Sequence, residues 1–249
     1  MAGNAFTVIN PGYRIVLDGD APPEREGDDY RLAVDVSPLW SDVNYSDTWP
    51  VGELAITQNA QTGKVHVPHL PITRMQSIIQ QPLRAIDEAS GATKRAKRLL
   101  SNIGPGVDLG AYVEYATGQT AAVISAGRVV LSQGDAKKSF YWELGPCKTK
   151  GLPESCNERS AQDQFRQWVD LLQTADAPML RDVGLSLRDL QSAAHQGRVV
   201  GSIEIGKSPF ELKSILGSPN VRMVYVTSAR LRCSPQDRIE CRFHPLPKR

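Results

Sequence analysis

Residues 30–36 alternate between apolar and polar side chains, and this period of two restricts the fold of the chain more than any other feature. Leu32 and Val34 fall on one side of such a segment, whereas Arg31 falls on the other. Successive side chains of a β-strand point to opposite faces, so the pattern is typical of a strand with one buried face. Residues 13–17 show the same alternation. The N-terminal part therefore predicts antiparallel strands that cover a core on one side.

The period then changes to that of a helix. Between residues 72 and 86 apolar side chains recur three or four positions apart, which predicts an amphipathic helical stripe. Pro82 lacks an amide hydrogen, so we expect it to divide this stripe into two short helices. Gly91 is expected to separate them from a further, basic helix at residues 93–100.

Strands and helices follow in mixed order along the rest of the chain. Helices are predicted after Ser160 and Ser186, because each serine can cap a helix N-terminus, and again at Pro209. This order lacks a regular βαβ alternation, so we expect an α+β fold, mostly antiparallel, with several short amphipathic helices. We expect one domain over residues 1–249, with a candidate division near 104–107. Further strands are predicted at residues 52–57 and 64–67, which form a hairpin, within 107–144, and at 198–205, 221–233 and 238–243.

Composition places the chain among ordinary globular proteins. Hydrophobic residues make up 41% and charged residues 22%, which excludes disordered, collagen-like and coiled-coil classes. No apolar run approaches the roughly 18–20 residues that a membrane helix needs. The first residues have neither a basic segment nor an apolar one of the kind found in secretory signals. We therefore expect a cytoplasmic protein with no membrane partner.

Charge is distributed unevenly along the chain, although the total is only +2. Residues 1–56 contain three basic and ten acidic residues, a net charge of −7, which leaves +9 for the remainder. Such asymmetry indicates a nucleic-acid-binding side or complementary charged faces that meet between subunits. Two basic groups are candidates for binding a nucleic-acid backbone, because Lys and Arg neutralise phosphates. One is on the predicted basic helix and the other on the C-terminal strand pair: Lys94, Arg95, Lys97 and Arg98, and Arg230, Arg232, Arg238 and Arg242.

Residues 201–208 match the G-x-x-x-x-G-K-[ST] pattern of a phosphate-binding loop. In such a site Gly201 and Gly206 would shape the loop, Lys207 would reach the phosphates and Ser208 would hold Mg²⁺. The residues between the glycines alternate like a strand, however, and two of them are β-branched.

A capped helix explains the same letters. Ser208 is suited to be an N-cap, Pro209 to be the first helical residue and Glu211 to complete a capping box, with Gly217 at the end. We therefore expect a strand and a capped helix here, and nucleotide binding is the alternative.

The cysteines and histidines match no established site pattern. Cys147 and Cys156, and Cys233 and Cys241, form two local pairs without the close spacing of zinc ligands, so we expect buried thiols. In an oxidising compartment the pairs could form disulfides instead. The histidines of the His-Val-Pro-His segment, residues 66–69, are spaced like half of a metal site.

These features lead to three hypotheses, with no cofactor or metal expected in the first. The preferred one is a non-catalytic subunit of a larger assembly, which contacts other protein subunits through oppositely charged faces and binds DNA or RNA through the basic residues. The second is an enzyme, either a nucleotide hydrolase at residues 201–208 or a metal-dependent hydrolase that uses His66 and His69. The third is a secreted binding module with two local disulfides.

Overall fold

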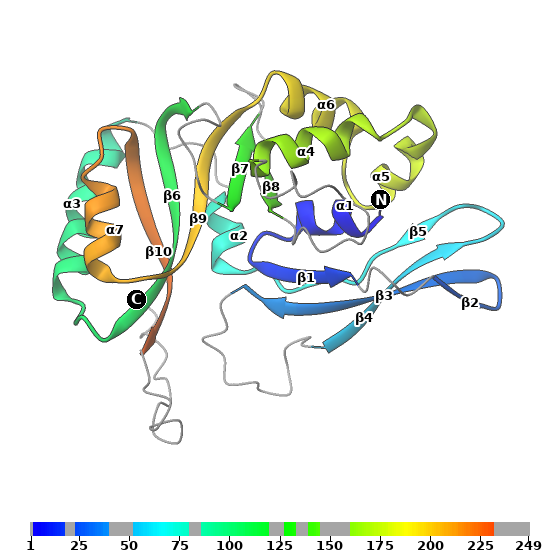
Figure 1. The fold of residues 1–249 in the computed structure, drawn as a ribbon, viewed down its shortest axis with the longest axis horizontal. Coiled ribbons are helices and arrows are strands. Elements are labelled where there is room, and N and C mark those ends of the chain that lie inside the picture. Colours follow the sequence, from blue (N-terminus) through cyan, green and yellow to red (C-terminus); the bar gives the residue numbers. More distant parts are fainter. Residues whose placement is uncertain are drawn as a thin grey trace.

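The computed structural model describes residues 2–17, 23–39, 52–79, 86–119, 127–132, 139–144 and 160–231 (Figure 1). In this part of the chain every strand pair is antiparallel, and two sheets are packed with helices. The predicted α+β fold class is confirmed. Among the described residues, no helix has the length and apolar character to cross a membrane.

The first sheet is formed by the N-terminal quarter of the chain. Val34 and Ile56 are buried on its inner face, while Arg31, Asp35 and Glu53 lie on the outer face, as the period-two pattern predicted. The order is β1-β3-β4-β5, and β2 also pairs with β3. The strands are β1 (Tyr13–Leu17), β2 (Glu24–Glu26), β3 (Asp29–Pro38), β4 (Gly52–Asn59) and β5 (Val65–His66).

The second sheet brings together strands from the middle and the end of the described chain. Its order is β10-β6-β9-β7-β8, so β6 pairs with two strands that follow it by about a hundred residues. Leu109, Ala111 and Val113 share one buried face of β6. The strands are β6 (Val107–Gln119), β7 (Arg128–Ser132), β8 (Ser139–Glu143), β9 (Arg198–Lys207) and β10 (Val221–Leu231).

Helices cover one face of the second sheet in two groups. Val113 and Val129 both lie opposite Ser202 in register, so they share this face. Helices α3 and α7 pack on the half formed by β10 and β6, whereas α4 and α6 pack on the half formed by β7 and β8 (Figure 1). These helices are α3 (Ile86–Asn102), α4 (Ala161–Asp170), α6 (Leu187–His195) and α7 (Pro209–Leu216).

The opposite face of the second sheet is covered in its centre by the short helix α2 (Arg74–Ile79). Met75 and Ile79 pack there against Tyr112, Val130, Tyr141 and Ile203. A much larger cluster joins the inner face of the first sheet to β7, β8 and helices α4 and α6. The two sheets therefore share one continuous apolar contact region.

The predicted helix starts are confirmed by their caps. The hydroxyls of Ser160, Ser186 and Ser208 each accept a hydrogen bond from the backbone N–H three residues further on. Each bond satisfies an amide that a helix N-terminus would otherwise leave without a partner. Gly217 is the C-cap of α7, also as predicted.

The structure differs from expectation in four places. Gly91 does not interrupt α3, because a single helical glycine costs only about 1 kcal/mol and Ala96 and Leu100 hold the helix on the sheet. Helix α1 (Ala2–Ile9) is present where no helix was predicted, and β2 lies in a segment expected to be a loop. A 3₁₀ turn, η3 (Thr174–Asp176), and helix α5 (Ala177–Asp182) were likewise not predicted. The candidate division near 104–107 stays a prediction; in the structure this segment connects α3 to β6, and residues of both lie in one apolar cluster.

Candidate nucleic-acid interface

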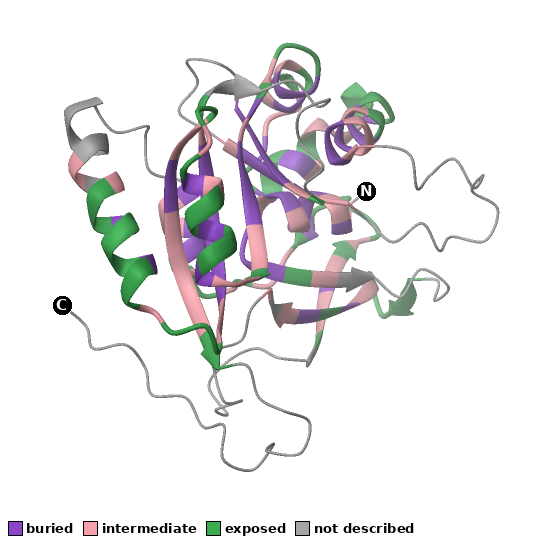
Figure 2. Cartoon of the chain, turned by 60° about the vertical axis from the view of Figure 1, so that its left-hand side comes forward, coloured by how far each residue is buried: buried purple, intermediate pink, exposed green. Residues whose placement is uncertain are grey.

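Helix α3 presents a continuous basic surface. Lys94, Arg95, Lys97 and Arg98 are all exposed, whereas Ala96 and Leu100 are buried against the sheet. The reason is geometric: Lys94 and Arg98 point away from the two buried residues, while Arg95 and Lys97 lie on the two flanks of the exposed side. The outward sides of α3 and α7 are coloured as exposed in Figure 2. We call these four residues the α3 cations.

The α3 cations have no salt-bridge partner among the residues that the structure describes. No described carboxylate therefore offsets these charges through an ion pair. Clustered, unpaired cations create a local positive potential that attracts polyanions. When a polyanion binds, it releases its own condensed counterions, which favours binding at low salt.

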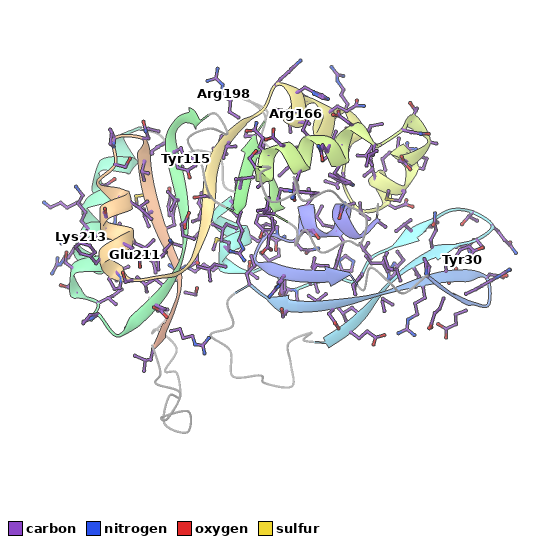
Figure 3. The ribbon with its side chains drawn as sticks, in the orientation of Figure 1. Tyr30, Tyr115, Arg166, Arg198, Glu211 and Lys213 are labelled. Atoms are coloured by element: carbon purple, nitrogen blue, oxygen red, sulfur yellow. The ribbon has the colours of Figure 1, made fainter. Side chains whose placement is uncertain are left out.

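Helix α7 extends this surface with a fifth cation. Lys213 Nζ donates a hydrogen bond of 3.0 Å to Ser101 Oγ, so this side chain bridges the two helices. Lys213 and Glu211 are labelled on α7 in Figure 3. The acidic Glu211 is already engaged, since its Oε2 accepts hydrogen bonds of 2.7 Å from both the backbone N–H and the hydroxyl of Ser208. Among the side chains described on α3 and α7, five exposed cations therefore stand against one exposed carboxylate, that of Glu211.

The second predicted basic group is described only at its first residue. Arg230 is exposed near the end of β10 and lies opposite Asp108 in the register with β6. Arg232, Arg238 and Arg242 lie outside the described residues.

The segment that matches a phosphate-binding loop is a strand. Gly201 lies within β9, where its register partners are Glu114 on β6 and Val130 on β7. A Cβ atom at Gly201 would lie 2.5 Å from Val113 O, so this glycine allows close strand packing. A phosphate loop needs backbone amides that turn toward an anion, and an extended strand does not provide them.

The polar residues of the same pattern are engaged within the fold. Lys207 Nζ lies 3.8 Å from Glu204 and 3.9 Å from Glu211. Ser208 caps α7, and Glu211 completes its capping box. Gly206 has a φ of +71°, at the end of β9 where the chain turns into α7. The expected arrangement, a strand followed by a capped helix, is the one in the structure.

The metal-site and cysteine candidates gain no support. His66 is exposed on β5 and His69 is exposed in the segment that follows. In the described ranges no three His, Cys, Asp or Glu side chains are grouped so that they could hold a metal ion. The four cysteines, at positions 147, 156, 233 and 241, lie outside those ranges.

A buried ionic cluster on the α2-covered side of the second sheet was missed by sequence reasoning. The Glu114 side chain is only 4% exposed, and its two oxygens lie 3.2 Å from the Arg222 guanidinium and 3.0 Å from the Tyr225 hydroxyl. The ring of Tyr225 stacks on that of Tyr112, with centroids 6.0 Å apart. Burial, with a smaller contribution from Glu114, raises the pKa of Tyr112. The only sequence signal was Glu114, the one charged residue between positions 109 and 119.

A similar arrangement of Tyr, Glu and Arg lies on the same face at the other edge of the sheet, on β7 and β8. The Tyr141 hydroxyl donates to Glu143 at 3.2 Å, and Arg128 lies 2.7 Å from the same carboxylate. Burial raises the pKa of Tyr141 well above its ordinary value, and Glu143 adds to this shift. Both clusters pair each carboxylate with a guanidinium, which is how buried charges are stabilised.

The outer face of the first sheet carries the opposite charge from α3. Asp35 and Glu53 are exposed and lie directly opposite each other on β3 and β4. Like charges at such positions repel and destabilise a sheet. Arg31 offsets part of this repulsion at 3.9 Å from Glu53. In Figure 1, α3 lies at the left edge of the molecule, and the first sheet extends from its centre to the right.

Comparison with protein-family models, with curated proteins and with solved structures gives no match to this chain.

Proposed function

We propose that this protein is a non-catalytic subunit of a larger assembly, and that the α3 cations bind the phosphate backbone of a nucleic acid. The observation that carries the proposal is the cluster of four exposed cations on one helix, none of which has an ion-pair partner among the described residues. Charge runs on ordinary solvated helices commonly alternate in sign and form pairs three or four residues apart. Residues 94–98 contain no acidic side chain.

The acidic face of the first sheet supports the second part of the proposal, contact with other protein subunits. Asp35 and Glu53 oppose each other at a cost in stability, and a basic surface on a partner would remove that cost. The two charged surfaces lie on separate elements, α3 at the left edge of Figure 1 and the first sheet from the centre to the right, so one copy can engage a nucleic acid and a protein neighbour at once.

The test is a charge reversal on α3 with a matched control. Lys94→Glu with Arg98→Glu changes the total charge as much as Arg14→Glu with Lys64→Glu, and all four side chains are exposed. Binding to labelled single-stranded and duplex oligonucleotides is measured by fluorescence anisotropy at low salt. We expect the α3 variant to lose at least about tenfold in affinity for both ligands, because two phosphate contacts become repulsive.

The control variant, Arg14→Glu with Lys64→Glu, separates the effect of the position of the charges from the effect of the total charge. Arg14 and Lys64 lie on the first sheet and on the turn before β5, so their reversal changes net charge without touching α3. Equal losses in the two variants would mean that only the overall charge matters, and would contradict binding by α3. A wild-type protein with no affinity for either oligonucleotide at low salt would contradict the nucleic-acid part outright.

A further inference from the structure

Phe210 is an exposed aromatic residue that the packing of its helix does not require. It lies in the first turn of α7 and is 81% exposed, the largest fraction of any large apolar side chain in the described part of the chain. The contacts that hold α7 on the sheet come from Pro209, Leu212 and Leu216, which are buried. Exposing a phenyl ring to water is unfavourable, but single exposed apolar residues are common on protein surfaces. The surroundings of Phe210 distinguish it from such cases.

Phe210 lies at one end of a continuous line of cations across two helices. It precedes Lys213 by three residues, so the two side chains share a face of α7. Lys213 bonds to Ser101, which shares a face of α3 with Lys94 and Arg98 for the same reason. The stretch of α3 from residue 94 to residue 101 is about 10 Å long. From the helix spacing and the Lys213–Ser101 hydrogen bond, the line runs along α3, crosses to α7 at Lys213, which Figure 3 labels, and ends at Phe210.

We propose that this line binds single-stranded nucleic acid and that an unpaired base stacks on Phe210. The inference rests on the proposed function, since the α3 cations supply the contacts to the backbone. Proteins that bind single strands combine a cationic track with aromatic rings on which bases stack. In a duplex the base faces are stacked on each other and only their edges are accessible in the grooves. Phe210 can therefore contribute to binding a single strand but not a duplex.

The experiment separates the ring from the cations by comparing three ligands. Labelled oligothymidine has a backbone and unpaired bases, a labelled duplex has a backbone only, and heparin is a polyanion without bases. We expect Phe210→Ala to weaken oligothymidine binding about tenfold while affinities for duplex and heparin stay within about twofold. Phe210→Trp keeps a stacking ring, so it should retain affinity, and its added fluorescence should be quenched by oligothymidine.

The matched control is Leu171→Ala, which removes another highly exposed apolar side chain. Leu171 is 71% exposed at the end of α4, in the other helix group. We expect this variant to bind all three ligands like the wild type. Thermal unfolding of each variant verifies that the fold is retained.

Each outcome decides between the two proposals. Unchanged oligothymidine binding in Phe210→Ala, with loss in the α3 charge-reversal variant, overturns base stacking and leaves the proposed function standing. Equal loss for all three ligands in Phe210→Ala also overturns stacking, because heparin has no bases. If the wild type binds none of the nucleic acids at low salt, as for a surface that fits an acidic protein instead, both proposals fail.

Discussion

Gly201→Ala tests the strand arrangement at the residues that resemble a phosphate loop. A methyl group at this position would lie 2.4 Å from Cε2 of Tyr112 and 2.5 Å from the backbone oxygen of Val113. The tyrosine ring can rotate away, but the oxygen belongs to the neighbouring strand β6. Overpacking a core costs about 1–3 kcal/mol, and a shift of the strands weakens at least one backbone hydrogen bond, worth about 1 kcal/mol. We therefore expect the free energy of unfolding to fall by about 3 kcal/mol.

The measurement is urea unfolding followed by tryptophan fluorescence. Trp142 and Trp168 are buried in the core and stack with centroids 5.3 Å apart, so their emission reports on packing. Gly104→Ala is the matched control, since no atom lies within 4 Å of its added Cβ and it is expected to change stability by less than about 0.5 kcal/mol. A loss below about 1 kcal/mol for Gly201→Ala would refute the packing of β9 against β6 described above.

Two further predictions concern the buried polar residues of the second sheet. Burial raises the pKa values of Tyr112 and Tyr141 above the ordinary value near 10, so their contribution to stability is complete below pH 10 and is lost as the pH rises above it. The free energy of unfolding should fall by at most about 1.4 kcal/mol per pH unit for each residue. Urea unfolding above pH 10 should show this fall, and replacing both tyrosines by phenylalanine should reduce it. A fall that is unchanged in the double variant would mean that other groups cause it. Glu114→Ala removes the carboxylate that pairs with the Arg222 guanidinium, so it should lower the free energy of unfolding by about 3 kcal/mol. Adding Arg222→Met removes the charge left behind and should recover part of that loss, measured by urea unfolding. A double variant no more stable than Glu114→Ala would contradict the ion pair.

Local patterns predicted the individual elements well because their causes are local. The alternation at residues 30–36 reflects a strand with one buried face, and β3 has that arrangement. The residues at Ser208 and Gly217 predicted where α7 begins and ends, since helix capping depends on a few adjacent residues. Helix α1 has eight residues and no side-chain cap was recognised before it, so it had no comparable local signal.

Long-range pairing could not be predicted, because it depends on residues far apart in the sequence. Nothing near β6 indicates that β9 and β10 become its neighbours. The same limit hid the Glu114 cluster, whose partners Arg222 and Tyr225 follow it by more than a hundred residues.

The candidate interface was predicted in part. The α3 cations were singled out from their charge, and the structure places all four on the exposed side of the helix. Phe210 was not singled out, because the capping pattern around it explained the segment as ordinary helix. Its position beside Lys213, and the contact of Lys213 with α3, required the tertiary structure.

The salt dependence of oligonucleotide binding tests the central claim, that the α3 cations contact phosphates, most directly. For a single strand the logarithm of the affinity falls with the logarithm of the salt concentration by about 0.7 for each neutralised phosphate. Four α3 cations therefore predict a slope of about −3, and replacing Lys94 and Arg98 by alanine should reduce it to about −1.5. A slope that is the same in the wild type and in this variant would contradict the claim, because those two side chains would then contact no phosphate.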